Sequence, residues 1–295
     1  MLLVLTTERI SWMHKYPLLL KPAIKDYIWG GRRLIDEYGF ETNGEIAAEA
    51  WMLSCHKDGT NTVLNGFYAG KTLDCVLAEW GFTERFPILI KLIDAKQKLS
   101  VQVHPDDAYA LENEGELGKT EMWYVVDCEP GAKLAYGFNE NISADEFEKR
   151  IKDNTLDDFI NYVPVKKGDV FFISAGTLHA IGEGILIAEV QQNSNTTYRV
   201  SDYGRLGADG KPRELHIAKS LESVDFTLGV PEPVRNVKCE FFDFTQHDFP
   251  EEREVTAESD YLLVYEVEKA LSTLLRRGEK TSVGPGRVFL TAVEK

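Results

Sequence analysis

The chain has 295 residues, of which 43% are hydrophobic and 27% are charged. These values are ordinary for a soluble globular protein with one large domain or two of medium size. The formal net charge is −15 at pH 7, and such a surface repels phosphate backbones and anionic lipids. We therefore expect no nucleic-acid or membrane partner, and an anionic substrate would need basic side chains gathered locally.

The cysteines and the first residues indicate where the protein works. The first twelve residues contain an apolar run without a basic region or a small-residue cleavage site, which is not the pattern of a signal peptide. Met13 offers an alternative start, so residues 1–12 are interpreted as an N-terminal extension. No run reaches the length of a membrane span. Four scattered cysteines without a C-x-x-C motif favour free thiols in a reducing compartment, so we expect a cytoplasmic protein: Cys55, Cys75, Cys128 and Cys239.

Strand patterns dominate the chain. Short runs rich in β-branched and aromatic residues are separated by Gly, Pro and Asp. This density predicts a mainly β fold, an antiparallel sandwich or barrel of the jelly-roll type. The clearest of these runs cover residues 87–95, 99–105, 120–128, 132–138, 169–175 and 184–192.

Helices are few and short. One is expected over residues 71–81, ending at a glycine, and another over residues 215–226. A third, over residues 142–154, begins with Ser143 and Glu146 in the spacing of a capping box, and its apolar residues then recur at helical intervals.

A change in composition marks a boundary near residue 230. Two prolines interrupt the sequence there, and strand patterning then resumes to the end of the chain. We predict a larger domain over residues 13–230, with a helical insertion near residues 143–162. A smaller jelly-roll-like unit is expected over residues 231–295.

The stretch KLSVQVHPDD places two polar side chains on one face of a strand. Successive strand residues point to opposite faces, so Val101 and Val103 share one face while Gln102 and His104 share the other. An amide oxygen and an imidazole side by side indicate the beginning of a metal site.

Two further segments offer ligands. Glu121 is a carboxylate on an otherwise apolar strand, where burial is costly unless a metal ion or a lysine lies opposite it. Downstream, the spacing of Gly168, Gly176 and His179 matches the second sequence motif of the cupins, with Ser174 in the usual proline position.

These residues form a candidate set of four ligands with two imidazole nitrogens and two oxygens. Zn²⁺ accepts such ligands and leaves a position open for water or substrate, while Fe²⁺ and Mn²⁺ also tolerate them. The predicted metal site consists of Gln102, His104, Glu121 and His179.

Polar residues continue beyond this set. Glu189 and Gln191 share one face of the strand over residues 184–192, and Arg199 and Arg205 follow in a turn-rich stretch. Arginine at a barrel mouth suits bidentate phosphate recognition, whereas the alternative is a solvated arginine in a loop.

Together, the segments LSVQVHPDD, GKTEMWYVV, GTLHAIG and NTTYRVSDYGR resemble type I mannose-6-phosphate isomerase in its short bacterial form. The N-terminal KPAIKDYIWGGRRL is similar as well, so the resemblance covers roughly residues 16 to 225. It implies cupin jelly rolls, one zinc ion per subunit and a phosphosugar substrate. The implied reaction interconverts mannose 6-phosphate and fructose 6-phosphate through an enediolate, in a monomer or a homodimer.

The resemblance also implies roles for single residues. The family's zinc ligands fall on the four predicted above, and its active-site arginine falls on Arg199. Lys119 and Ser100 fall on positions that line the substrate pocket. With Arg205, these two are expected to bind the phosphate, and Arg199 is expected to stabilise the enediolate. The base stays open among Glu189, Lys119 and a zinc-bound hydroxide.

Other classes of protein remain as alternatives. They are an Fe²⁺ dioxygenase, an isomerase of another sugar phosphate and a sugar-binding cupin without catalytic activity. The last predicts missing or scrambled ligands, whereas the four-ligand set, Lys119 and Arg199 are all intact in this sequence.

Overall fold

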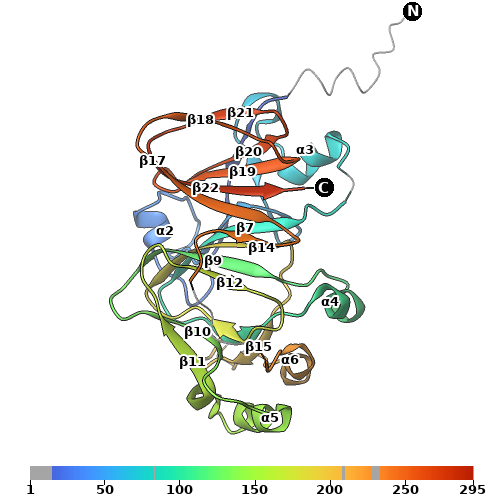
Figure 1. Ribbon diagram of the computed structural model, residues 1–295, viewed down its shortest axis with the longest axis vertical. Helices are drawn as coiled ribbons and strands as arrows, with labels where there is room; N and C mark the ends of the chain where they lie inside the picture. The colour runs from blue at the N-terminus through green and yellow to red at the C-terminus, as the bar shows by residue number, and fades with distance from the viewer. Residues whose placement is uncertain (1–14, 83, 208–209, 228–232, 295) are drawn as a thin grey trace, which may run out of the picture. The chain divides into compact units, whose positions relative to one another are not determined.

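The structure is a computed structural model that describes residues 15–82, 84–207, 210–227 and 233–294 (Figure 1). The interpretation of residues 1–12 as an extension, and of Met13 as a start, lies outside these residues. Within the described residues, no helix is both long enough and apolar enough to cross a membrane.

The described elements confirm a mainly β fold. The helical elements are α2 (Arg33–Asp36), η1 (Gly66–Tyr68), α3 (Leu73–Glu79), α4 (Asp107–Glu114), α5 (Ala144–Lys152), η2 (Leu156–Phe159) and α6 (Ile217–Ser223). The strands are β1 (Leu18–Lys21), β2 (Ala23–Lys25), β3 (Glu49–Leu53), β4 (Cys55–His56), β5 (Gly59–Thr60), β6 (Thr62–Val63), β7 (Ile88–Ala95), β8 (Val101–Val103), β9 (Glu121–Cys128), β10 (Lys133–Phe138), β11 (Ile160–Pro164), β12 (Val170–Ile173), β13 (His179–Ala180), β14 (Ile185–Gln192), β15 (Tyr198–Ser201), β16 (Val237–Lys238), β17 (Asp243–Phe249), β18 (Arg253–Thr256), β19 (Tyr261–Glu266), β20 (Leu271–Arg276), β21 (Lys280–Val283) and β22 (Gly286–Val293).

The chain divides into two compact units. The first unit takes its described residues from 1–23, 51–89 and 235–295, and the second unit consists of residues 24–50 and 90–234. The C-terminal segment thus shares its unit with two earlier segments, a grouping that composition along the chain does not reveal. The division into domains of residues 13–230 and 231–295 stays a prediction.

The first unit is built on an antiparallel sheet in the order β16-β17-β22-β19-β20-β1-β6. A hydrophobic cluster forms around Leu262 and Val264 of β19, Leu275 of β20 and Val288 of β22. The short pair β18–β21 contributes Val255 and Val283 to the same cluster.

The second unit contains a five-stranded sheet, β11-β10-β13-β8-β15, and most of a six-stranded sheet, β12-β9-β14-β7-β3-β2. One hydrophobic cluster draws on both sheets, with Trp123 and Ile187 from the six-stranded sheet and Leu134 and Tyr136 from the five-stranded sheet. The second unit is therefore an antiparallel sandwich, as expected for a jelly roll.

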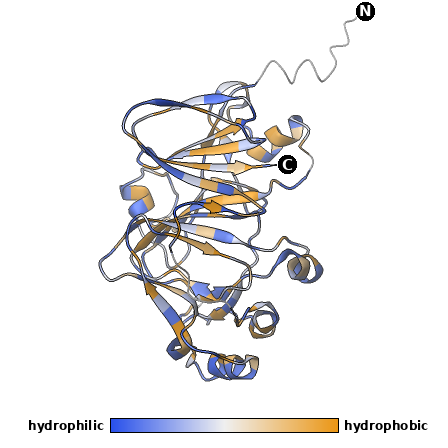
Figure 2. Cartoon of the chain, viewed as in Figure 1, coloured by the Kyte–Doolittle hydropathy of each residue, from blue (hydrophilic) through white to orange (hydrophobic). Residues whose placement is uncertain are grey.

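A second cluster lies on the other face of the five-stranded sheet. There Val101 and Val103 of β8 pack with Phe147 and Ile151 of α5, and residues of α6 pack against the same cluster. Figure 2 shows both hydrophobic and hydrophilic residues along α5, as a helix with one apolar face requires. Because Val101 and Val103 face the helices, the intervening Gln102 points into the sandwich.

The helix predictions are largely confirmed. The N-cap Ser143 accepts a hydrogen bond from the backbone of Glu146, as the capping box predicts, and α3 ends just before Gly81, whose φ is +82°. The sequence analysis missed α4, in which only Ala110 is buried, because its residues show no apolar periodicity.

Candidate metal centre

The register of the five-stranded sheet aligns four side chains across neighbouring strands. His179 of β13 pairs with Tyr136 of β10 on one side and with Gln102 of β8 on the other, and Gln102 also pairs with Arg199 of β15. Directly paired residues of an antiparallel sheet project to the same face. This row therefore brings a predicted metal ligand from each of two strands beside the predicted active-site arginine.

Three of the four predicted ligands meet at one point. The ligand atoms of His104, Glu121 and His179 all lie within 4.8 Å of one another, and the three residues are at most 1% exposed. The two imidazole Nε2 atoms face the two oxygens of one carboxylate. The His104 nitrogen lies 3.6 Å from Glu121 Oε2, and the His179 nitrogen lies 3.5 Å from Glu121 Oε1.

The backbone orients both imidazoles. Nδ1 of His104 lies 3.0 Å from the carbonyl oxygen of Thr196, and Nδ1 of His179 lies 2.9 Å from that of Thr177. A carbonyl only accepts, so each Nδ1 carries the proton and each Nε2 presents a lone pair. This is the arrangement by which proteins fix histidines for metal binding.

Gln102 reaches the same point. Its Nε2 lies 3.3 Å from Nε2 of His179. Rotation of the amide by 180° exchanges its nitrogen and oxygen, which places an acceptor oxygen at this position. The fourth predicted ligand therefore lies beside the three-residue cluster.

A line of alternating buried charges adjoins the cluster. Lys119 Nζ lies 2.7 Å from Oε2 of Glu121 and 3.8 Å from Oε1 of Glu189. On the far side of Glu189, Lys91 Nζ lies 3.0 Å from the same Oε1 and 3.9 Å from Oε2 of Glu49. The interpretation of Glu121 as the partner of a lysine is confirmed, and its metal-ligand interpretation stays a prediction, with two imidazoles facing the same carboxylate.

The two central carboxylates have opposite electrostatic environments. Burial raises the pKa of Glu121 to about 7, and the neighbouring charge of Glu189 adds to this effect. Burial also favours the neutral form of Glu189, but the ammonium groups of Lys119 and Lys91 outweigh it and lower the pKa of Glu189 to about 2. Trp123 Nε1 donates a hydrogen bond of 3.0 Å to Oε2 of Glu189. Glu189 is therefore ionised at neutral pH.

The arrangement fits a divalent cation. Oε1 of Glu121 is buried and accepts no hydrogen bond, whereas Oε2 forms the ion pair with Lys119. A buried carboxylate oxygen without a partner is costly unless a cation compensates it. Two neutral imidazoles and a carboxylate that converge from different strands are a common donor set for Zn²⁺ and for other first-row metals.

The predicted substrate residues lie at different places in the second unit. The Arg199 guanidinium donates through Nη1 to the carbonyl of Glu214 at 2.9 Å, while its buried Nε has no hydrogen-bond partner. Ser100 is buried and precedes β8, where it shares the strand face of Gln102. Arg205 donates to the carbonyl of Lys98 at 2.6 Å and pairs with Asp202.

Sequence reasoning missed Lys91. This lysine is 5% exposed in the middle of β7, all of whose eight residues are buried. The signal was present in the sequence. ILIKLIDA carries the cation Lys91 within an apolar strand, just as EMWYVV carries the anion Glu121 at the start of one. The reasoning applied to Glu121 applies equally to this position.

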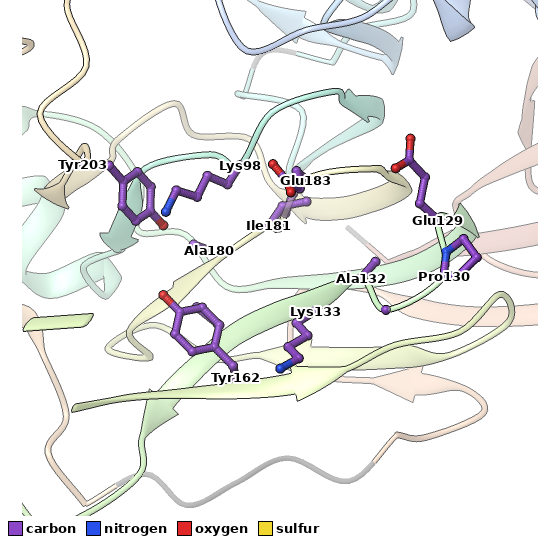
Figure 3. A pocket seen from close by; sticks show the side chains of 13 residues that line it. Lys98, Glu129, Pro130, Ala132, Lys133, Tyr162, Ala180, Ile181, Glu183 and Tyr203 are labelled. Carbon is purple, nitrogen blue, oxygen red and sulfur yellow. The ribbon is translucent and has the colours of Figure 1, made fainter. Parts of the chain in front are cut away.

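A separate cavity of about 340 Å³ lies on the reverse face of the five-stranded sheet (Figure 3). Ala135 and Ala180 line it, together with Tyr162 and Tyr203. Ala180 follows His179 in β13, and successive strand residues point to opposite faces. The sheet therefore separates this cavity from the candidate metal centre.

Comparisons with known proteins identify relatives of this chain. Residues 18–124 match the family described as the catalytic domain of type I phosphomannose isomerase. A mannose-6-phosphate isomerase from Streptococcus mutans is 46% identical over 221 residues, which are 73% of this chain and 69% of that protein. The mannose-6-phosphate isomerase ManA of Bacillus subtilis is 45% identical over 216 residues, which are 71% of this chain and 68% of that one.

The fold comparison gives the same answer over more of the chain. The crystal structure of a mannose 6-phosphate isomerase from Bacillus subtilis superimposes with a TM-score of 0.84 at 35% identity, and the match covers 95% of this chain and all of that one. The resemblance stated for residues 16 to 225 is thereby confirmed at the level of the family. The chain belongs to the type I phosphomannose isomerase family.

Proposed function

We propose that this protein is a metal-dependent aldose–ketose isomerase that interconverts mannose 6-phosphate and fructose 6-phosphate. The observation that carries the proposal is the convergence of His104, Glu121 and His179 in a chain of this family. The relatives bear the name of this activity. Substrate and product are isomers, so a proton moves between C2 and C1 while carbonyl and hydroxyl exchange, and no redox partner is needed.

We propose zinc as the metal. The three clustered residues and Gln102 would hold it, and the two neutral imidazoles together with the carboxylate match its preferences. A bound divalent cation supplies Lewis-acid polarisation of the sugar carbonyl, worth several kcal/mol of transition-state charge.

The residues around the cluster are assigned to proton transfer, to stabilisation of the enediolate and to phosphate binding. Glu189 is ionised and lies beside Lys119, so this pair is assigned to proton transfer between the two carbons. Arg199, with an unpartnered buried Nε, is assigned to the enediolate oxygen. Lys119, Ser100 and Arg205 are assigned to the phosphate. Of these, Arg205 must exchange part of its contact with Asp202 for the substrate.

The first test is coupled turnover of mannose 6-phosphate to fructose 6-phosphate, with and without chelator and with zinc restored. Loss of activity on chelation and its recovery with zinc would support reaction and metal together. Recovery with Fe²⁺ or Mn²⁺ but not with Zn²⁺ would reject zinc alone. A folded, zinc-loaded protein without turnover would reject the substrate assignment.

The second test addresses single roles. Arg199→Ala is expected to lower kcat by at least a hundredfold, the size of effect seen when one oxyanion donor is removed. Wild-type turnover in Arg199→Ala would show that Arg199 does not stabilise the enediolate. Glu189→Gln is expected to lower kcat alone, whereas Lys119→Met, which removes a proton-transfer partner and a phosphate contact together, is expected to change both kcat and KM, because a pure phosphate contact changes KM more than kcat.

We also propose that the protein works in the cytoplasm as a monomer or homodimer. Its acidic composition and its cysteine pattern support the location. Light scattering after size-exclusion chromatography would measure the oligomeric state, and a larger assembly would contradict this part of the proposal.

A further inference from the structure

Four consecutive polar residues are buried beside the candidate metal centre. Gln191, Gln192, Asn193 and Ser194 are 0%, 2%, 1% and 0% exposed, respectively. Amides and hydroxyls are mostly found on protein surfaces, and four in a row inside a sandwich need a compensating set of hydrogen bonds. We refer to residues 191–194 as the buried polar segment.

The Ser194 hydroxyl joins two backbone segments that lead to residues of the candidate metal centre. It donates a hydrogen bond of 2.7 Å to the carbonyl of Leu117 and accepts one of 3.2 Å from the backbone N–H of Thr196. The carbonyl of Thr196 is the acceptor that orients His104. One hydroxyl thus connects the support of a metal ligand to the segment that leads to Lys119.

Gln191 and Gln192 of the buried polar segment form further hydrogen bonds to the same two backbone segments. Gln191 Nε2 donates to the carbonyl of Ser194 at 2.6 Å. The side-chain oxygen of Gln192 accepts from the N–H of Thr120 at 2.8 Å, between Lys119 and Glu121, and its Nε2 donates to Asp107 at 2.9 Å.

The backbone of residues 117–120 is closely packed and hydrogen-bonded. The N–H of Gly118 donates to Asp107 Oδ1 at 2.7 Å, and the N–H of Lys119 donates to the carbonyl of Pro105 at 3.0 Å. A Cβ on Gly118 would come within 2.4 Å of the backbone of Asp106. Hydrogen bonds from several directions therefore fix residues 117–120.

We propose that Ser194 is a positioning residue that acts through both His104 and Lys119. Its hydroxyl holds the Thr196 carbonyl on the imidazole of His104 and holds Leu117 in the segment that aims the Lys119 ammonium at Glu121. The inference deepens the proposed function and rests on it, since the geometry being held is that of the metal centre and its neighbouring lysine.

The test is Ser194→Ala in the full-length protein, with zinc affinity measured by competition with a chromophoric chelator. Removal of groups that orient metal ligands typically costs 10- to 100-fold in metal affinity or activity. We expect Zn²⁺ binding to weaken by at least tenfold and kcat at saturating zinc to fall by about tenfold as well, because the segment that leads to Lys119 loses the hydrogen bond to Leu117.

The matched control is Ser259→Ala. Ser259 is a buried serine of the first unit whose hydroxyl donates to a single backbone carbonyl, that of Tyr261, at 2.7 Å. Its loss is expected to lower the unfolding midpoint in urea while the zinc affinity stays within twofold of wild type. A purely structural serine at position 194 would behave like this control, and that result would overturn the proposal.

A second variant covers the case in which Ser194→Ala does not fold. Gln191→Met keeps the side-chain length but removes the donor that holds the Ser194 carbonyl, and it is expected to weaken zinc binding in the same direction. Unchanged zinc affinity and kcat in folded Gln191→Met would then count against the proposal. The zinc measurement needs no substrate, so wild-type protein that binds zinc without turning over mannose 6-phosphate would reject the proposed function alone. Wild-type protein that binds no zinc would reject both.

Discussion

The buried charged side chains of the second unit are the residues whose presence the packing does not explain. Glu121, Glu189, Lys91 and Lys119 are each at most 5% exposed inside an apolar sandwich. Replacing such groups by well-packed apolar residues is often neutral or stabilising. The proposed metal centre and proton-transfer pair would account for these residues better than stability does.

At this scale, Glu121→Gln tests the metal centre. The substitution keeps shape and volume but removes the charge that two imidazoles and a cation share, so we expect the bound metal to fall below a tenth of the wild-type stoichiometry and turnover to fall at least a hundredfold. Atomic emission spectroscopy after gel filtration measures the metal. Glu254→Gln, which alters the exposed ion pair with Lys280, should retain full metal content. Wild-type stoichiometry in Glu121→Gln would refute the site.

Lys91→Met tests the buried charge line. Without this ammonium, Glu189 keeps only the more distant Lys119 as a cationic partner, at 3.8 Å. Breaking a buried pair on one side typically costs about 3–5 kcal/mol in the free energy of unfolding. We expect a loss of about 3 kcal/mol in urea unfolding.

The control for Lys91→Met is Lys280→Met on the surface. Its ion pair with Glu254 is more than half exposed, and such pairs contribute little. Equal stability losses in the two variants would show that Lys91 has no special role in holding Glu189.

The four candidate metal ligands could be selected from the sequence because each breaks a local pattern. Gln102 and His104 share the strand face that Thr, Ser or Lys ordinarily occupies, Glu121 lies in an apolar strand, and His179 follows a glycine bend with motif spacing. Lys91 breaks its strand in the same way and was missed. The partners of Arg205 could not be predicted from the sequence, because its contacts to Asp202 and Lys98 depend on how a loop returns to β8.

At the scale of elements, the ends of helices follow local chemistry. Ser143 caps α5 through its own hydroxyl, which accepts from Glu146 at 3.2 Å, and the sequence alone predicts this contact. Helix α4 was missed although Asp106 caps it, because a helix with one buried residue has no periodic apolar signal.

Ser143→Ala is expected to lower the free energy of unfolding by about 1 kcal/mol, the usual cost of losing an N-cap side chain. Equilibrium denaturation in urea measures it. Thr72→Ala is the comparison, since Thr72 occupies the N-cap of α3 without a side-chain hydrogen bond and its replacement should change stability less. A larger loss in Thr72→Ala would contradict the capping argument.

At the scale of the whole molecule, the apolar clusters of each unit hold the fold and a metal ion adds to it. Both sheets of the second unit contribute to one cluster, so we expect the sandwich to form without the metal. A ligand that binds only the folded state stabilises it by about 2.7 kcal/mol at a concentration one hundred times its Kd.

Chelation is therefore expected to lower Tm by several degrees while the far-UV circular dichroism keeps its β signature. Differential scanning calorimetry of metal-free and zinc-loaded protein measures the shift. The Glu121→Gln variant should show almost no shift on addition of zinc. Global unfolding of the wild-type protein by chelator would show that the metal, and not the apolar clusters, holds the second unit together.

The sequence by itself determined the strand-rich fold, the capped helix α5, the candidate set of four metal ligands and the resemblance to the family. These follow from period-two alternation, local hydrogen-bonding chemistry and motif spacing, all of which are properties of short segments. Only the tertiary structure decided which unit each segment joins, that Lys91 completes the charge line, and that the Ser194 hydroxyl connects Thr196 to Leu117. These contacts join residues far apart in the chain, and their partners depend on how strands and loops pack together.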